Sequence, residues 1–231
     1  MKEHYECTVI GGGIVGTALT YALSLFGKKA LLLERHTVGS GCTGLSAGTI
    51  AAAGMGNGSN SDLTAAYHTV TMLRKLEEEG FDAGYEATGA LQLAMNAAEK
   101  TFLETKYEWF RRNQYDAQFI PDNRSVRQIE PNLSSRVVAA LLLPFSGHVD
   151  PILCAQAFAD AAESNGATVL ENAEASFIEE SPSGCIISIK GKNGRREISS
   201  DHVVIATGGI SKSLISKLKG GEDGSRPVPT I

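Results

Sequence analysis

The chain lacks the features expected of a nucleic-acid, metal or membrane protein. Its 21 lysines and arginines are outnumbered by 26 aspartates and glutamates, and the resulting net charge of −5 argues against the basic face of a nucleic-acid binder. No apolar run approaches the roughly 18 residues of a membrane span. The five histidines have no zinc-ligand spacing, and no Ser/His/Asp constellation is evident. We therefore expect no nucleic-acid partner, no transmembrane segment and no metal.

Cysteine is also scarce. The four cysteines, Cys7, Cys42, Cys154 and Cys185, form no CxxC pair and have no metal-ligand spacing. Cys7 and Cys185 fall in apolar strand patterns and Cys154 in a helical pattern, which is typical of buried free thiols. The first four residues lead into a strand without an apolar or arginine-rich targeting segment. These features favour a reducing compartment, and we expect a cytoplasmic protein.

The first 35 residues have the pattern of a strand, a helix and a second strand. Residues 6–10 form a short apolar run typical of a buried parallel strand. Residues 14–26 have a helical pattern, and residues 30–33 form a second apolar run. This order predicts a βαβ unit. The helix side chains predicted to face the sheet are Ala18, Leu19, Ala22, Leu23 and Phe26.

A glycine-rich turn joins the first strand to the helix, with Gly11, Gly13 and Gly16 in the GxGxxG positions. The first glycine permits the tight turn, the second lets a pyrophosphate approach, and the third allows close helix packing. The free N–H groups of the helix N-terminus attract phosphate. Glu34 ends the second strand near the spacing of about 20 residues expected of an acid that binds ribose hydroxyls. This context favours a dinucleotide site over a purely structural turn. The acid disfavours a 2′-phosphate, so FAD and NAD remain.

Residues 39–58 favour flavin over nicotinamide. An NAD domain would normally continue with alternating strands and helices. This segment is instead dense in Gly, Ala, Ser and Thr, whose small side chains let a backbone lie against a large flat ligand. A flexible low-complexity linker is the alternative. However, Leu45, Ile50 and Met55 are apolar anchors that a linker would not need.

The rest of the chain alternates between helical and strand patterns. Asp150 followed by Pro151 is typical of a helix start, and capping alone explains the pair. A helix over residues 61–79 carries Leu63, Val70, Leu73 and Leu76 near one face. The other predicted elements are helices over residues 97–113 and 152–164, and strands over residues 85–95, 137–144, 168–170, 175–178, 186–190, 196–198 and 203–206.

Several motifs, in a fixed order along nearly the whole chain, resemble those of one family. They are residues 11–16 (GGGIVG), Glu34-Arg35, residues 43–48 (TGLSAG), residues 127–133 (RQIEPNL), residues 147–151 (GHVDP) and residues 203–211 (VVIATGGIS). With these motifs the chain resembles the D-amino-acid-oxidase-type FAD-dependent oxidoreductases. Within that superfamily it is most similar to the branch of glycine oxidase, sarcosine oxidase and D-amino-acid dehydrogenase.

The resemblance implies an α/β fold, in which a Rossmann-like FAD-binding domain of the glutathione-reductase type carries an inserted α+β substrate domain. Residues 1–84 and 146–219 would form the FAD domain, residues 85–145 part of the substrate domain, and residues 220–231 the start of a return to it. Relatives continue with further substrate-domain strands. We therefore expect a truncated fold with an incomplete substrate site, as in a truncated gene product or one half of a two-chain enzyme.

The motifs and the resemblance together predict FAD contacts from several short segments. The predicted cofactor-binding residues are Gly11, Gly12, Gly13, Ile14, Val15, Gly16, Glu34, Arg35, Thr43, Ser46, Ala47, Gly48, Ala175, Ala206, Thr207 and Gly208. Packing would also explain the glycines after residue 206. No catalytic residue is predicted, which is compatible with flavin chemistry, because the isoalloxazine accepts the hydride while the protein supplies orientation and electrostatics.

The resemblance implies oxidation of an amino acid or secondary amine by hydride transfer to FAD, followed by hydrolysis of the imine. The electron acceptor would be O₂, a quinone or another oxidant, and a homo-oligomer or a complementary chain stays open as the protein partner. One alternative is an FAD-dependent 2-hydroxy-acid or glycerol-phosphate dehydrogenase. Another, of a different class, is a non-catalytic nucleotide-binding remnant or the subunit of a two-chain enzyme.

Overall fold

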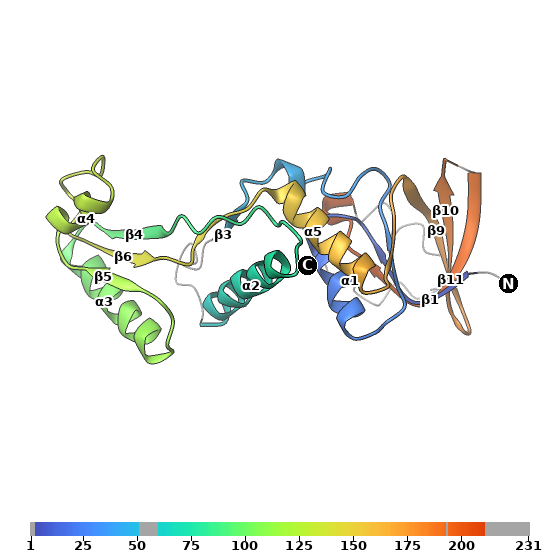
Figure 1. Cartoon of the computed structure of the whole chain (residues 1–231), viewed down its shortest axis with the longest axis horizontal. Helices are drawn as coiled ribbons and strands as arrows, with labels where there is room; N and C mark the ends of the chain where they lie inside the picture. The colour runs from blue at the N-terminus through green and yellow to red at the C-terminus, as the bar shows by residue number, and fades with distance from the viewer. Residues whose placement is uncertain (1–2, 51–59, 193, 211–231) are drawn as a thin grey trace. The chain divides into compact units, whose positions relative to one another are not determined.

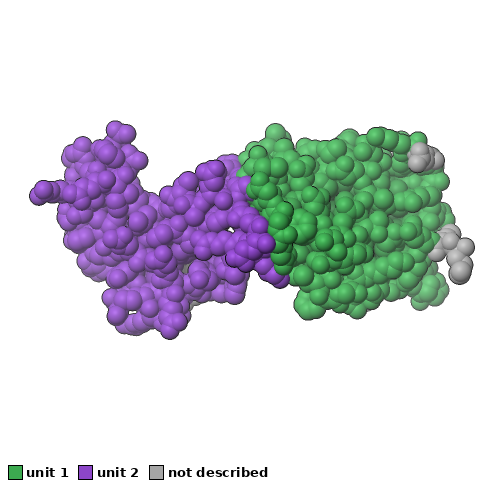
Figure 2. Space-filling view, in the orientation of Figure 1, with its two compact units in different colours: residues 1–46, 79–83, 150–231 green, residues 47–78, 84–149 purple. Residues whose placement is uncertain are grey.

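The computed structural model describes residues 3–50, 60–192 and 194–210 (Figure 1). The chain divides into two compact units (Figure 2). The first unit comprises Met1–Ser46, Glu79–Ala83 and Asp150–Ile231, and the second comprises Ala47–Glu78 and Gly84–Val149. The predicted segment 220–231 and Met55 lie outside the described residues.

A six-stranded sheet forms the centre of the first unit, with the strand order β8-β2-β1-β11-β10-β9. The pairs β8–β2, β2–β1 and β1–β11 are parallel, whereas β11–β10 and β10–β9 are antiparallel. This mixture confirms the predicted α/β class. The strands are β1 (Glu3–Ile10), β2 (Ala30–Leu33), β8 (Thr168–Leu170), β9 (Ala173–Ser181), β10 (Gly184–Gly191) and β11 (Gly194–Ile205).

The strand β11 corrects the sequence prediction, which placed separate strands at residues 196–198 and 203–206. It is continuous, because the intervening polar residues pair on both sides: Ser199 and Ser200 each pair with β1 and with β10. Buried Ser200 accepts a hydrogen bond from the Thr8 hydroxyl at 3.0 Å and donates to the His202 carbonyl at 2.8 Å. Satisfied polar side chains thus continue a strand where the apolar pattern stops.

Two helices, α1 (Ile14–Leu25) and α5 (Pro151–Ser164), pack against each other and against the parallel strands (Figure 1). Leu19 and Leu23 contact the sheet core as predicted. Phe26 does not, because α1 ends before it and its side chain is 83% exposed. The fully buried face of α1 instead carries hydroxyl groups, and Thr20, for example, donates to the Gly16 carbonyl at 2.8 Å.

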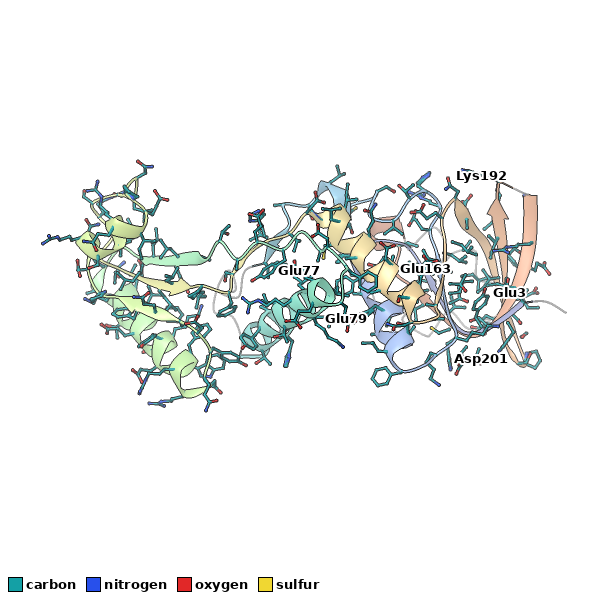
Figure 3. All side chains as sticks on the ribbon, in the orientation of Figure 1. Glu3, Glu77, Glu79, Glu163, Lys192 and Asp201 are labelled. Carbon is teal, nitrogen blue, oxygen red and sulfur yellow. The ribbon has the colours of Figure 1, made fainter. Side chains whose placement is uncertain are left out.

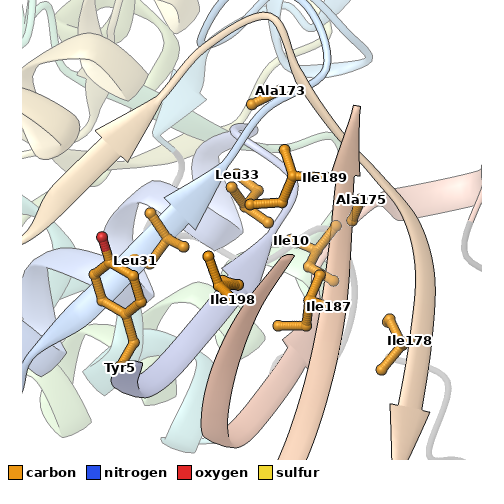
Figure 4. Packing of buried hydrophobic residues seen from close by; sticks show 10 residues of the cluster. All are labelled: Tyr5, Ile10, Leu31, Leu33, Ala173, Ala175, Ile178, Ile187, Ile189 and Ile198. Atoms are coloured by element: carbon orange, nitrogen blue, oxygen red, sulfur yellow. The ribbon is translucent and has the colours of Figure 1, made fainter. Parts of the chain in front are cut away.

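The opposite face of the sheet carries a second hydrophobic cluster, which is aliphatic except for Tyr5 (Figure 4). Its members come from both the parallel and the antiparallel strands, so the cluster joins the two halves of the sheet. They are Tyr5, Ile10, Leu31, Leu33, Ala173, Ala175, Ile178, Ile187, Ile189 and Ile198.

The second unit contains a three-stranded antiparallel sheet in the order β4-β6-β5. The predicted strand over residues 85–95 is shorter than expected, because Gly84 and Gly89 adopt positive φ angles of 60° and 77° before it begins. The elements are β3 (Thr49–Ile50), which pairs with β7 (Gly147–His148), the helices α2 (Asn60–Glu78), α3 (Ala97–Arg112) and α4 (Asn123–Ile129), and the strands β4 (Ala90–Ala94), β5 (Gln118–Ile120) and β6 (Ala139–Leu143).

The alternation of side chains along β6 gives this small sheet a core on each face. Leu141 and Leu143 pack with Phe110 of α3, whereas Ala140 packs with Val126 of α4. The helix α2 buries Val70, Leu73 and Leu76, as predicted, while the side chain of Leu63 lies outside the described residues.

The compact units differ from the predicted domain limits most in one segment. The prediction assigned residues 47–78 to the FAD domain, but they cluster with the second unit. Part of the reason is Val70 of α2, which lies in the same apolar cluster as Phe110 and Leu141. Residues 146–149, also predicted in the FAD domain, cluster with the second unit as well. The assignment of these units to FAD and substrate domains stays a prediction.

Candidate dinucleotide site

The parallel strands end together at one edge of the sheet. Ile10, at the end of β1, pairs with Leu33 of β2 and Ile205 of β11. Hydrogen bonds continue past these ends, because the Ala206 N–H donates to the Ile10 carbonyl at 2.8 Å and the Gly11 N–H donates to the Leu33 carbonyl at 2.8 Å. Ligands of open α/β sheets bind outside the carboxyl ends of such strands.

Gly11 and Gly16 form the rigid part of the glycine turn. Gly11 has a φ angle of 115°, and a Cβ atom there would lie 2.8 Å from the carbonyl carbon of Ala206 and 3.1 Å from the Cα of Thr207. A Cβ atom on Gly16 would collide with the carbonyl oxygen of Gly11. Both neighbours are backbone and cannot rotate away. These glycines therefore bring α1 and residues 206–207 against the turn.

Gly13 has a different neighbour. It is the N-cap residue of α1 and has no side chain with which to cap the helix. The Ile14 N–H donates instead to the Thr43 hydroxyl at 3.0 Å, and a Cβ atom on Gly13 would lie 3.0 Å from that hydroxyl oxygen. Thr43 begins the short helix η1 (Thr43–Leu45), and Ser46 donates to its carbonyl at 2.8 Å. Residues distant in sequence thus meet at the N-terminus of α1.

Glu34 lies against the same turn. One carboxylate oxygen accepts the Gly12 N–H at 2.7 Å, and the other accepts the His36 N–H at 2.8 Å. A Cβ atom on Gly12 would lie 2.8 Å from the Cβ of Glu34, so glycine is also needed here. A carboxylate has about four lone-pair positions. Each oxygen of Glu34 therefore keeps acceptor capacity for a ribose hydroxyl.

The turn between β8 and β9 supports the Glu34 segment, and sequence reasoning missed it. The Asn172 N–H donates to the His36 carbonyl at 2.8 Å, and the Ala173 N–H donates to the Glu34 carbonyl at 2.8 Å. The Glu171 carboxylate accepts the Val38 N–H at 2.7 Å. Asn172 has a φ angle of 53°, a conformation that asparagine tolerates better than most residues. An asparagine between two predicted strands was the available signal.

The structure brings together most, but not all, of the predicted contact residues. Ala175 lies in the aliphatic cluster and pairs with Ile189, and Arg35 is exposed. Ala47 and Gly48 belong to the second unit, where the Gly48 carbonyl accepts the Val149 N–H at 2.9 Å. The predicted residues that meet around the turn are Gly11, Gly12, Gly13, Ile14, Val15, Gly16, Glu34, Thr43, Ser46, Ala206 and Thr207. Gly208 follows them as the first residue of the short helix η2 (Gly208–Ile210).

A Ser/His/Asp group does form, contrary to the sequence analysis. The Ser199 hydroxyl lies 3.1 Å from Nδ1 of His4, and Nε2 of His4 lies 3.4 Å from the Asp201 carboxylate. Strand pairing makes these residues neighbours, which their sequence separation concealed. The His4 and Asp201 side chains are about half exposed. His4 is the second residue of β1, so the group lies at the opposite end of this strand from the glycine turn. Figure 3 labels Asp201 and Glu3, the first residue of β1. We assign them no chemistry.

The thiols are distributed largely as predicted. Cys7 and Cys154 are buried, and burial raises the pKa of the Cys154 thiol to about 11 and also raises the pKa of Cys7. Cys185 is partly buried and Cys42 is exposed. Among the residues that the structure describes, no group of three His, Cys, Asp or Glu side chains could hold a metal ion. In the same part of the chain, no helix has the length and apolarity needed to cross a bilayer.

Comparison with known proteins assigns the chain to a family. Residues 6–230 match the family described as FAD dependent oxidoreductase (DAO). The chain belongs to this DAO family. Glycine oxidase from Bacillus subtilis is 29% identical over 223 residues, which are 94% of this chain and 58% of the relative.

Two solved structures of DAO-family type extend the comparison. L-proline dehydrogenase from P. horikoshii superposes with a TM-score of 0.77 at 27% identity, over 94% of this chain and 56% of that one. Glycine oxidase from Geobacillus kaustophilus gives a TM-score of 0.73 at 26% identity, over 93% and 58%. The chain thus spans little more than half the length of these relatives.

Proposed function

We propose that this DAO-family protein binds FAD at the turn between β1 and α1 and oxidises an amino acid or a secondary amine. The observation that carries the proposal is the meeting of Gly11, Glu34 and Ala206 at the carboxyl edge of the parallel strands. The glycine turn is shaped for a pyrophosphate, and the acid lies where a ribose would follow. The glycine oxidase and proline dehydrogenase relatives support an amine as the substrate.

The residues of the site have separable tasks in this proposal. Gly11 and Gly16 set the backbone path, and the N-terminus of α1 attracts the phosphates. Glu34 orients the adenosine through its ribose hydroxyls. When bound, FAD supplies the two-electron acceptor. The substrate would lose a hydride from the carbon that bears the amine and a proton from the nitrogen, and water would hydrolyse the resulting imine.

Two measurements test this function in turn. We expect the purified protein to bind one equivalent of a flavin, and the flavin released by denaturation to be FAD rather than FMN. In a form of the protein that spans the full length of these relatives, we then expect anaerobic bleaching of the flavin absorbance by one member of a panel containing glycine, sarcosine, proline and D-amino acids. Bleaching only by glycerol 3-phosphate or a 2-hydroxy acid would reject the amine substrate but keep the cofactor. A protein that binds no flavin would reject the proposal.

A further inference from the structure

The N-terminus of α1 is capped by a residue from another part of the chain. Helices usually begin with a Ser, Thr, Asp or Asn whose own side chain accepts one of the free N–H groups. Gly13 occupies this position in α1 and has no side chain. Thr43 takes over the role, because its hydroxyl oxygen lies 3.0 Å from the Ile14 nitrogen.

The segment that carries Thr43 is held in place independently of α1. The Gly44 N–H donates to the Gly39 carbonyl at 2.8 Å. A Cβ atom on Gly44 would lie 3.2 Å from Cγ1 of Ile152, so η1 also packs closely on α5. Little conformational entropy is therefore lost when the Thr43 hydroxyl reaches α1.

Gly13 and Thr43 depend on each other. A Cβ atom on residue 13 would lie 3.0 Å from the Thr43 hydroxyl oxygen, and among the described residues, its own chain neighbours aside, no other heavy atom lies within 4 Å of that position. A side chain at residue 13 would thus make this hydroxyl shift by a few tenths of an ångström, which strains its hydrogen bond with the Ile14 N–H. The need for glycine at the second position of the motif arises here within the protein itself, in addition to any need to admit a pyrophosphate.

We propose that Thr43 is a positioning residue of the dinucleotide site, which caps α1 and holds the glycine turn in shape, and that residue 13 is glycine so that this cap can form. The inference deepens the proposed function and rests on it for the ligand. The cap itself is a property of the protein without FAD. The hydroxyl accepts from Ile14 and keeps its own proton to donate, so an anion at this helix end would gain a further donor.

The first experiment follows the cap in the flavin-free protein. We expect Thr43→Val to accelerate amide hydrogen exchange at Ile14 and to raise the unfolding equilibrium constant about fivefold, the usual effect of a lost helix cap. Thr43→Ser should restore both values. Ser40→Ala is the matched control, because this hydroxyl lies in the same loop but donates to the Thr37 carbonyl. Unchanged exchange at Ile14 in Thr43→Val would overturn the proposal.

A double-mutant cycle tests the dependence of Gly13 on Thr43. We expect Gly13→Ala and Thr43→Ala each to raise the unfolding constant about fivefold. The double variant should be no worse than either single one, because both remove the same hydrogen bond. Effects that multiply to about 25-fold would show independent roles and reject the inference.

Thr43→Asp distinguishes the effect of residue 43 on helix capping from its effect on FAD binding. A carboxylate can accept the Ile14 N–H at the positive end of the helix, so the flavin-free protein should stay as stable as the wild type. The added charge should repel a pyrophosphate and weaken FAD binding at least about tenfold. Retained stability with unchanged FAD affinity would contradict the proposed phosphate position and leave the cap standing. Lost stability would contradict the cap itself.

Discussion

The two compact units reach their structures by different kinds of contact. In the first unit, glycines allow backbone to lie directly on backbone, as where Gly16 faces the Gly11 carbonyl. In the second unit, large aromatic rings fill the core: Phe110 lies 6.1 Å from Tyr115 and 6.4 Å from Phe145, measured between ring centroids. The second unit has one such contact too, because a Cβ atom on Gly147 would collide with the carbonyl oxygen of Glu86. The glycine turn of the first unit should therefore be intolerant of added atoms, and the aromatic core of the second unit of lost ones.

The beginnings of the helices set α1 apart from the others. In the first unit, α5 is capped by its own Asp150, whose carboxylate accepts the N–H groups of Ile152 and Leu153. In the second unit, α3 and α4 are capped by their own Asn96 and Asp122, whose side chains accept the N–H groups three residues ahead. In the first unit, α1 depends on Thr43 from a later segment. Helices of the second unit can therefore start from local sequence, whereas α1 reaches its final form only when η1 is in place.

The largest effect is expected from Gly16→Val, which tests whether backbone contact limits the first unit. The new side chain would meet the Gly11 carbonyl oxygen, which belongs to a turn that cannot rotate away. We expect more than about 4 kcal/mol of destabilisation, the range of severe overpacking and strain, and no flavin binding. Urea unfolding followed by circular dichroism and flavin absorbance would measure both.

Gly41→Val is the matched control for that variant. A Cβ atom on Gly41 would find nothing within 4 Å, and residue 41 is exposed in the same glycine-rich region. Its stability should stay within about 0.5 kcal/mol of the wild type, as for most surface substitutions. Equal damage by both variants would mean that the close contact at Gly16 is not what matters.

Phe110→Ala is the corresponding test of the second unit. The Phe110 side chain is 1% exposed and contacts three other aromatic rings, so its loss should cost about 3–5 kcal/mol. Trp109, the single tryptophan of the chain, stacks on Tyr115 and reports this core by fluorescence. Phe102→Ala, on the same helix but 46% exposed, should change the urea midpoint little. Similar losses for both phenylalanines would remove the contrast between the units.

The contrast also explains how much of the structure could be predicted from sequence. The glycine turn and Glu34 were found because backbone contacts demand one residue type at a fixed spacing. The aromatic core was not found, because Tyr67, Phe110 and Phe145 are far apart in sequence and have no common spacing. The contact of Thr43 with Ile14 was hidden for the same reason, although both residues were predicted individually.

Two further differences between prediction and structure concern buried polar residues, in the strand β11 and in the helix α1. The continuity of β11 depends on neighbours on both sides of Ile198 to Ser200, and a single-chain pattern contains no information on them. The polar, buried face of α1 is similar, because hydroxyls that bond back to helix carbonyls are compatible with burial. Apolar periodicity alone therefore reveals neither the continuity of β11 nor the buried hydroxyl face of α1.

Glu34→Ala should have a smaller and more selective effect than the substitutions above. It removes the acceptor for the Gly12 and His36 N–H groups and, in the proposed complex, for the ribose. We expect FAD affinity to fall by about 1–3 kcal/mol, the scale of a hydrogen bond to a charged group. FMN lacks the adenosine, so its affinity should fall less. Calorimetric titration of both flavins measures the difference, and equal losses would count against adenosine recognition by Glu34.

The smallest effect is expected from Asp122→Asn, which tests whether the local caps of the second unit respond to acid. The N–H of Ser125 and then its hydroxyl donate to Asp122 and hold the pKa of this carboxyl below its ordinary value. A lowered pKa in the folded state stabilises the protein above the unfolded pKa of about 3.9, and this contribution is lost as pH falls through the folded value. Asparagine caps a helix about as well but does not titrate.

Near pH 7 we therefore expect the wild type and Asp122→Asn to have almost the same urea midpoint, measured by Trp109 fluorescence. Between about pH 4 and 2 the wild type should lose stability more steeply than the variant. Parallel pH profiles for wild type and Asp122→Asn would show that the charge on this cap does not contribute to the stability of the second unit.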